Sequence, residues 1–137
     1  MEFVSLPVVS IDGKKQHLQK RLKAYALRII RLYEALPKTG ASHVITRQLL
    51  RSGTSPGAQY REACRAKSDA DFISKIEGAL QELDESDYWL ELLVDGGYQT
   101  EKKLKPLRTH CHLRQYRQQN QSHEEEEDGS AGTRHEG

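Results

Sequence analysis

Residues 68–97 constrain the fold more than any other segment, because their pattern is that of one long amphipathic helix. Ser68 stands where an N-cap residue is preferred, and acidic residues follow in the first turn, where the helix dipole favours negative charge. Gly96 and Gly97 end the pattern. A stripe of this length needs other helices to bury it, which indicates a helical bundle. The predicted buried stripe is Phe72, Ile73, Ile76, Ala79, Leu80, Leu83, Leu90, Leu93 and Val94.

Three further segments complete the predicted bundle. Residues 17–36 repeat apolar side chains at three- and four-residue steps until Pro37 ends the helix. Residues 42–66 form a second helix, with Ser42 as its expected N-cap and a kink expected at Pro56. A fourth helix is expected to begin between residues 98 and 107. The predicted fold is an all-α, antiparallel up-down four-helix bundle over residues 17–121.

The two ends of the chain differ from this pattern. Residues 1–16 are interpreted as extended or loosely ordered, with a turn at Asp12-Gly13. After Leu107 only Leu113 and Tyr116 are large and apolar, so a fourth helix has almost no apolar face. Residues 122–137 have the composition of a disordered acidic tail. Reading the codons of residues 109–122 one base later permits the apolar sequence LIAIFVSIVNKTKA, so a frameshift from about residue 109 is a hypothesis for this departure.

Charge is strongly segregated along the chain, although the formal net charge is only +1. Residues 14–67 contain 13 Lys/Arg and 2 Asp/Glu, a net of +11. Residues 68–101 contain 1 Lys and 10 Asp/Glu, a net of −9, and residues 124–137 contain 6 Asp/Glu and 1 Arg, a net of −5. Such blocks create fields that influence the choice of partner rather than the fold.

The basic block is the strongest candidate for a functional surface. It is expected to neutralise the phosphates of RNA or DNA without reading base sequence. In the other interpretation, the acidic third helix neutralises the first two helices, within a subunit or between subunits. Both interpretations stay open and can hold together. The predicted nucleic-acid-binding residues are Lys20, Arg21, Lys23, Arg28, Arg31, Arg61, Arg65 and Lys67.

Some charged residues are expected to pair between helices instead. The predicted polar layer consists of Arg47, Arg51, Lys75, Glu82 and Glu85. Tyr88 and Trp89 lie among acidic residues in the sequence. They are therefore interpreted as core and rim aromatics rather than as a platform on which bases stack.

No catalytic or cofactor-binding motif is evident, and the chain is interpreted as a non-enzyme without cofactor or metal. The acidic helix lacks the Glu-x-x-His pairs of metal sites in bundles, and His110, Cys111 and His112 are too close in sequence for typical zinc ligands. Cys64 and Cys111 are interpreted as free thiols in a reducing cytoplasm. No apolar run approaches the roughly 20 residues of a membrane helix. A cytoplasmic location and no membrane partner are expected.

Two runs of sequence resemble a known bacterial family. They are RQLLRSGTSPGAQYREACRAKSDADFISK, from residue 47, and ELDESDYWLELL, from residue 82. Over about residues 18–107 the chain resembles the "four helix bundle protein" family, whose first described members are encoded in intervening sequences of large-subunit ribosomal RNA genes. The accessory protein of diversity-generating retroelements is a more distant resemblance.

The resemblance implies a left-handed four-helix bundle that assembles as a toroidal homopentamer, with proposed nucleic-acid binding and no established enzyme activity. The distant relative implies an alternative, an accessory ring for a reverse transcriptase or another protein partner. A purely structural protein encoded in an intervening sequence is a third possibility. The family's fourth helix usually carries an apolar run and a basic tail, from which this chain departs after Leu107. At positions matching the family, the packing and polar-layer residues are Arg47, Arg51, Ser52, Gly53, Tyr60, Arg61, Glu62, Ala63, Phe72, Lys75, Glu82, Glu85, Tyr88, Trp89 and Leu90.

Overall fold

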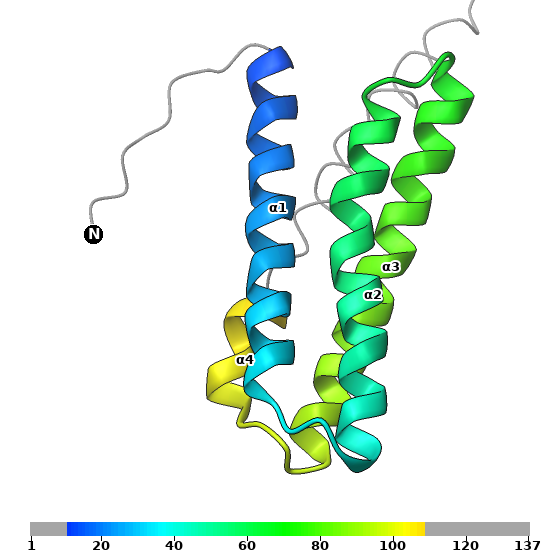
Figure 1. The fold of residues 1–137 in the computed structure, drawn as a ribbon. Coiled ribbons are helices and arrows are strands. Elements are labelled where there is room, and N and C mark those ends of the chain that lie inside the picture. The colour runs from blue at the N-terminus through cyan, green and yellow to red at the C-terminus, as the bar shows by residue number, and fades with distance from the viewer. Residues whose placement is uncertain (1–10, 109–137) are drawn as a thin grey trace, which may run out of the picture.

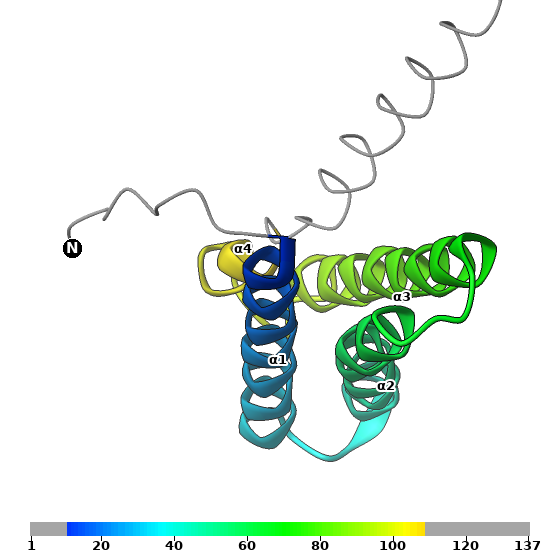
Figure 2. The ribbon, with the colours of Figure 1, turned by 90° about the horizontal axis from the view of Figure 1, so that it is seen from above.

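The structure, a computed structural model, describes residues 11–108 as helices joined by short loops. The helices in this range are α1 (Ile11–Ala35), α2 (Gly40–Ala63), α3 (Asp69–Asp95) and α4 (Glu101–Arg108). Successive helices run in opposite directions (Figure 1). Seen from above, α2 packs against both α1 and α3, and α4 packs against α3 (Figure 2). The predicted all-α class is confirmed.

Several predictions concern residues outside the described range. These are the loosely ordered start before residue 11, the end of the bundle beyond residue 108, the frameshift from about residue 109, the group at 110–112 and the acidic tail at 122–137.

Helix α1 begins at Ile11, six residues before the predicted start at residue 17. The turn expected at Asp12-Gly13 is therefore replaced by the first turn of a helix. Residues 14–16 are good helix formers, so the helix extends beyond the apolar stripe that the prediction followed.

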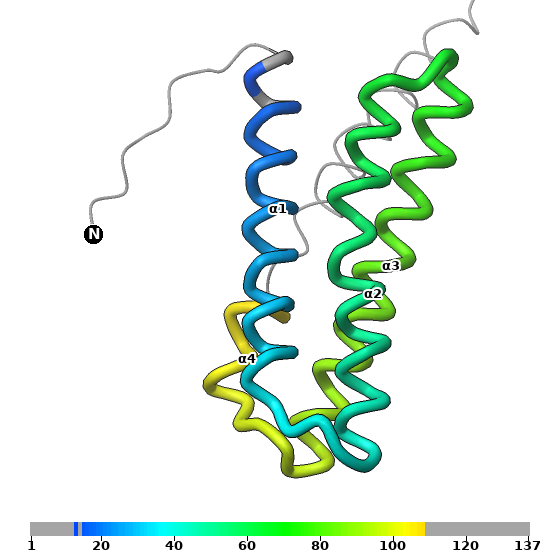
Figure 3. The backbone as a smooth tube through the Cα atoms, in the orientation of Figure 1, coloured from blue at the N-terminus to red at the C-terminus, as the bar shows by residue number. Residues whose placement is uncertain are grey.

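Helix α2 begins at Gly40, and its N-cap is Thr39 rather than the predicted Ser42. Ser42 is buried instead and donates its hydroxyl to the Thr39 carbonyl at 3.2 Å. The helix then continues through Pro56 without a break (Figure 3). Hydroxyls in the turn before Pro56 bond to backbone carbonyls, with Thr54 Oγ1 2.7 Å from the Leu50 oxygen.

Helix α3 has the predicted caps at both ends. The Ser68 hydroxyl accepts from the backbone N–H of Asp71 at 3.1 Å. At the other end Gly97 has φ 77°, which an L side chain rarely adopts. The N–H of Tyr98 reaches the Leu93 carbonyl and the N–H of Gly97 reaches the Val94 carbonyl, which is the Schellman pattern of a helix stop.

The core lies between the helices and draws its largest share from α1 and α3. On α3 the predicted stripe is mostly correct, but Ile73 is 43% exposed. Tyr88, interpreted together with Trp89 as core and rim aromatics, is 54% exposed. The prediction that Ile73 packs inward is therefore wrong, and Tyr88 belongs to the rim rather than to the core. The buried apolar residues are Leu18, Leu22, Tyr25, Ile29, Leu36, Leu49, Tyr60, Ala63, Ile76, Ala79, Leu80, Leu83, Leu90, Leu93, Leu104 and Leu107.

Candidate nucleic-acid interface

Two adjoining hollows lie between α1 and α2, and together we call them the α1–α2 groove. Both are lined by Gln19 and Arg61. The larger hollow, about 350 Å³, adds Glu62, Cys64 and Arg65, and the smaller, about 210 Å³, adds Gln16, Lys20 and Lys23. Lys20 and Lys23 are three residues apart on α1, and Arg61 and Arg65 are four apart on α2, so each pair shares a helix face. The groove thus brings four cations from two helices together.

These four cations form no ion pair with a carboxylate within the described chain. Lys20, Lys23, Arg61 and Arg65 are all exposed, and none forms an ion pair with residues 11–108. The groove consequently carries a concentration of positive charge, which attracts anions.

The acid that lines the groove, Glu62, is already bonded elsewhere. Its Oε2 lies 3.1 Å from Nζ of Lys75 on α3. That hydrogen bond raises the pKa of Lys75 above its ordinary value. Because Lys75 balances the charge of Glu62, this carboxylate does little to neutralise the groove.

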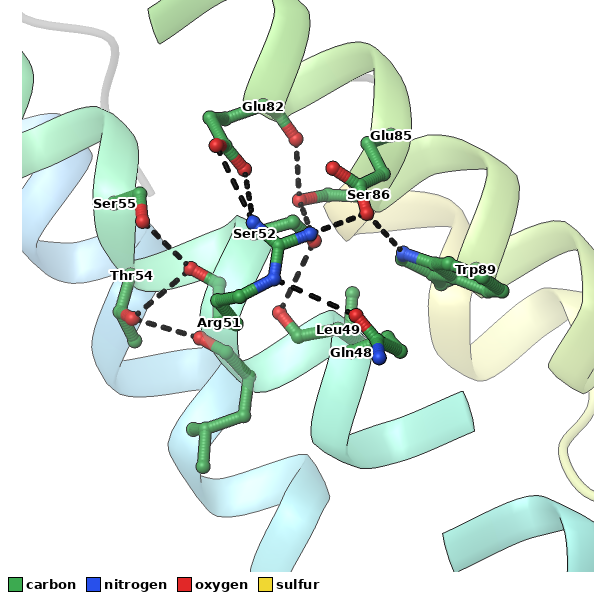
Figure 4. A network of polar contacts seen from close by, with 11 residues as sticks. Gln48, Leu49, Arg51, Ser52, Thr54, Ser55, Glu82, Glu85, Ser86 and Trp89 are labelled. Carbon is green, nitrogen blue, oxygen red and sulfur yellow. Dashed lines mark hydrogen bonds and ion pairs between the residues drawn. The ribbon is translucent and has the colours of Figure 1, made fainter. Parts of the chain in front are cut away.

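Two acids of α3, Glu82 and Glu85, form ion pairs with a different arginine, Arg51 of α2 (Figure 4). Its Nη1 lies 3.1 Å from Oε2 of Glu82, and its Nη2 bonds Oε1 of Glu85. Trp89 donates its Nε1–H to the same Glu85 oxygen at 3.1 Å. The hydrogen bond from Arg51 lowers the pKa of Glu85 below its ordinary 4.5, and the same bond raises the pKa of Arg51. Since the Arg51 side chain is 50% exposed, solvent limits the stabilisation to roughly 1 kcal/mol.

Beside this network, two buried hydroxyls join α2 to α3 (Figure 4). Ser86 Oγ lies 2.8 Å from Ser52 Oγ and 2.8 Å from the Glu82 carbonyl oxygen. Ser52 in turn donates to the Leu49 carbonyl at 3.4 Å. Both serines have no exposed surface, so these bonds satisfy groups that water cannot reach.

The end of α4 is tied to α3 by Arg108. Its Nε lies 3.2 Å from Oδ1 of Asp87, and its Nη2 lies 3.9 Å from Oε2 of Glu91. The hydrogen bond to Asp87 raises the pKa of Arg108. Four acids of α3 therefore pair with Arg51 and Arg108.

The predicted polar layer is smaller than expected. Arg51, Glu82 and Glu85 come together, whereas Lys75 bonds Glu62 instead. Lys75 lies seven residues before Glu82 on α3, about 10 Å along the axis, and antiparallel packing places it against the far end of α2. Arg47 is exposed and makes no ion pair within residues 11–108.

The eight predicted nucleic-acid-binding residues also separate into two groups. Four line the groove, as described above. Arg21 and Arg28 are half-buried and seven residues apart on another face of α1, because the helical period rotates them away from Lys20 and Lys23. Arg31 on α1 and Lys67 after α2 are exposed but line neither hollow.

Within residues 11–108, no three His, Cys, Asp or Glu side chains come together as metal ligands. Cys64 is a free thiol at the wall of the groove. Over the same range, every helix is too short or too polar to cross a bilayer.

Comparison with known proteins identifies the family of this chain. Residues 14–116 match the family described as 23S rRNA-intervening sequence protein. The chain belongs to this family. A protein of unknown function from the S23 ribosomal protein family of Bacteroides thetaiotaomicron, known from its crystal structure, is 39% identical, with a TM-score of 0.63 over 69% of this chain and 85% of that chain. No curated protein matches. The resemblance expected from residues 18–107 is thus confirmed.

Two residues of the groove and one buried serine on α3 were not among the site residues predicted from the sequence. Gln16 and Gln19 were passed over because uncharged amides carry no charge signal, although they lie four residues and one residue before Lys20. Ser86 was missed although a serine between Leu83 and Leu90, at apolar spacing, indicates a buried polar contact.

Proposed function

We propose that the α1–α2 groove binds the sugar–phosphate backbone of nucleic acid, RNA or DNA, in a cytoplasmic protein without enzymatic activity or cofactor. The observation that supports this most is the separation of charge. Four acids of α3 are engaged by Arg51 and Arg108, while Lys20, Lys23, Arg61 and Arg65 share one groove without an ion-pair partner in the described chain. Cations placed in this way neutralise phosphates and release counterions.

Assembly is part of the proposal. Several copies of the groove in one oligomer would bind one strand with avidity, because the second contact becomes intramolecular. The homopentamer implied by the family resemblance is the assembly we propose. Exposed apolar side chains on three helices support an interface between copies, namely Leu27, Val44, Ile73 and Tyr88.

The test compares two matched double variants. Arg61→Gln with Arg65→Gln removes two charges from the groove, and Lys102→Gln with Lys103→Gln removes two exposed charges from α4. Binding to labelled structured RNA and to duplex DNA is measured across a salt series, with oligomer mass recorded on the same samples. We expect the slope of log affinity against log salt to fall by about 1 to 2 for the groove variant and to stay unchanged for the α4 variant.

Equal slopes for both variants would contradict the proposal. A groove variant that loses its oligomer mass instead would favour the interpretation in which these charges hold copies together. An intact oligomer of the parent protein that binds no nucleic acid at low salt would favour a protein partner, such as a reverse transcriptase.

A further inference from the structure

Gln19 differs from the four cations of the groove in depth and in charge. It is half-buried, whereas the four cations are exposed, and it lines both hollows. Its side chain makes no hydrogen bond to the described residues. The groove therefore presents exposed cations at its rim and an unengaged amide at its wall.

The dimensions of the groove favour a single strand over a duplex. The larger hollow, about 350 Å³, lies at the lower end of small-ligand sites, which begin near 300 Å³, and the smaller, about 210 Å³, lies below it, so the groove suits one nucleotide-sized group at a time. The phosphates of a duplex would reach the exposed cations, but a duplex holds each sugar in a fixed position beside its phosphates and cannot turn one into a hollow. A flexible single strand can place one sugar inside.

A carboxamide at this depth suits a ribose better than a deoxyribose. The amide has an acceptor and two donors, and the 2′-hydroxyl is both a donor and an acceptor. The 2′-hydroxyl is also the group by which a protein distinguishes RNA from DNA at a given site. The described lining residues of the groove include no aromatic side chain, so stacking on bases is not what selects the strand there.

We propose that the groove takes single-stranded RNA, with the rim cations on the phosphates and Gln19 hydrogen-bonded to a ribose 2′-hydroxyl. This inference rests on the proposed function and adds to it the class of nucleic acid and the residue that selects it.

The experiment uses the full chain and four labelled probes of one sequence and length: single-stranded RNA, single-stranded DNA, duplex RNA and duplex DNA. Gln19→Met removes the amide at similar volume, and Gln81→Met makes the same change at an exposed position of α3 outside the groove. Charge alone favours the duplexes, because a duplex releases about 0.9 counterions per contacted phosphate against about 0.7 for a single strand.

The parent protein is expected to bind single-stranded RNA about fivefold more tightly than single-stranded DNA, the effect of one hydrogen bond, and more tightly than either duplex. Gln19→Met is expected to lower RNA affinity to that of DNA and to leave DNA affinity unchanged. Gln81→Met is expected to change neither. Far-UV circular dichroism confirms that both variants fold.

Three results would overturn the inference: duplexes bound as tightly as single strands, RNA and DNA strands bound equally, or Gln19→Met weakening both strands alike. In each of these cases nucleic acid is still bound, so the proposed function survives. If none of the four probes binds, the proposed function itself fails.

Discussion

Replacing Gly53 with alanine tests how closely α1 and α2 approach each other. A Cβ atom at Gly53 would lie 2.8 Å from Cγ1 and 3.1 Å from Cγ2 of Ile29. Ile29 is completely buried, and its branched side chain has one strongly preferred rotamer in a helix, so it cannot turn away. Overpacking of this kind costs about 1 to 3 kcal/mol.

Gly57, one helical turn further along α2, is the matched control. A Cβ atom there would lie 3.7 Å from Cβ of Leu22, which is ordinary contact. Both substitutions gain about 1 kcal/mol of helix propensity, so the difference between the two variants isolates the overpacking. We expect Gly57→Ala to unfold at a higher urea concentration than the parent protein and Gly53→Ala to be about 1 to 3 kcal/mol less stable than Gly57→Ala.

The assay is urea unfolding followed by circular dichroism at 222 nm, repeated at two protein concentrations so that any contribution from assembly is visible. Equal stability of the two alanine variants would refute the reasoning. It would mean that α1 and α2 separate at little cost and that Gly53 is not needed for their packing.

The remaining predictions concern the polar contacts. Ser86→Ala should destabilise the protein by about 1 to 3 kcal/mol, because it leaves the buried Ser52 hydroxyl without its partner. The double variant Ser52→Ala with Ser86→Ala should lose less stability than the sum of the two single variants, because it removes both hydroxyls. A double-mutant cycle of urea unfolding measures this difference, and additive losses would contradict it. The folded pKa of Glu85 is lowered, so its contribution to stability is complete above the unfolded value near 4.5 and is lost as the pH falls below it. Urea midpoints between pH 7 and pH 3 should therefore fall less steeply for Glu85→Gln, and an unchanged pH profile would count against the Arg51–Glu85 bond. Ser68→Ala should cost about 1 kcal/mol through loss of the N-cap bond, with Ser74→Ala at an exposed position of α3 as the control.

The ends of a helix were predicted correctly where the capping residues give a strong local signal. Ser68 and Gly97 marked both ends of α3 because capping depends on a few neighbouring residues. The starts of α1 and α2 were misplaced because polar helix formers carry no periodic signal and because more than one residue suited the cap of α2. Ile73 was predicted to pack inward from periodicity alone, which does not say how wide the covered face of the helix is.

The sequence predicted the residue types of the candidate site but not its position in the fold. Thirteen Lys/Arg in residues 14–67 indicated an anion-binding surface, and this follows from charge alone. The sequence did not show which cations meet, because residues forty positions apart become neighbours only through the antiparallel packing of α1 and α2.

By itself, then, the sequence determined the all-α class, the order of the helices and the segregation of charge, because periodicity, caps and composition act over a few residues. Only the tertiary structure decided that Arg51 and Arg108 form ion pairs with four acids of α3. It also decided that Lys20, Lys23, Arg61 and Arg65 share a groove with Gln19. The physical reason is that a charge has a partner only at a distance of a few ångströms, and those distances are set by how helices pack.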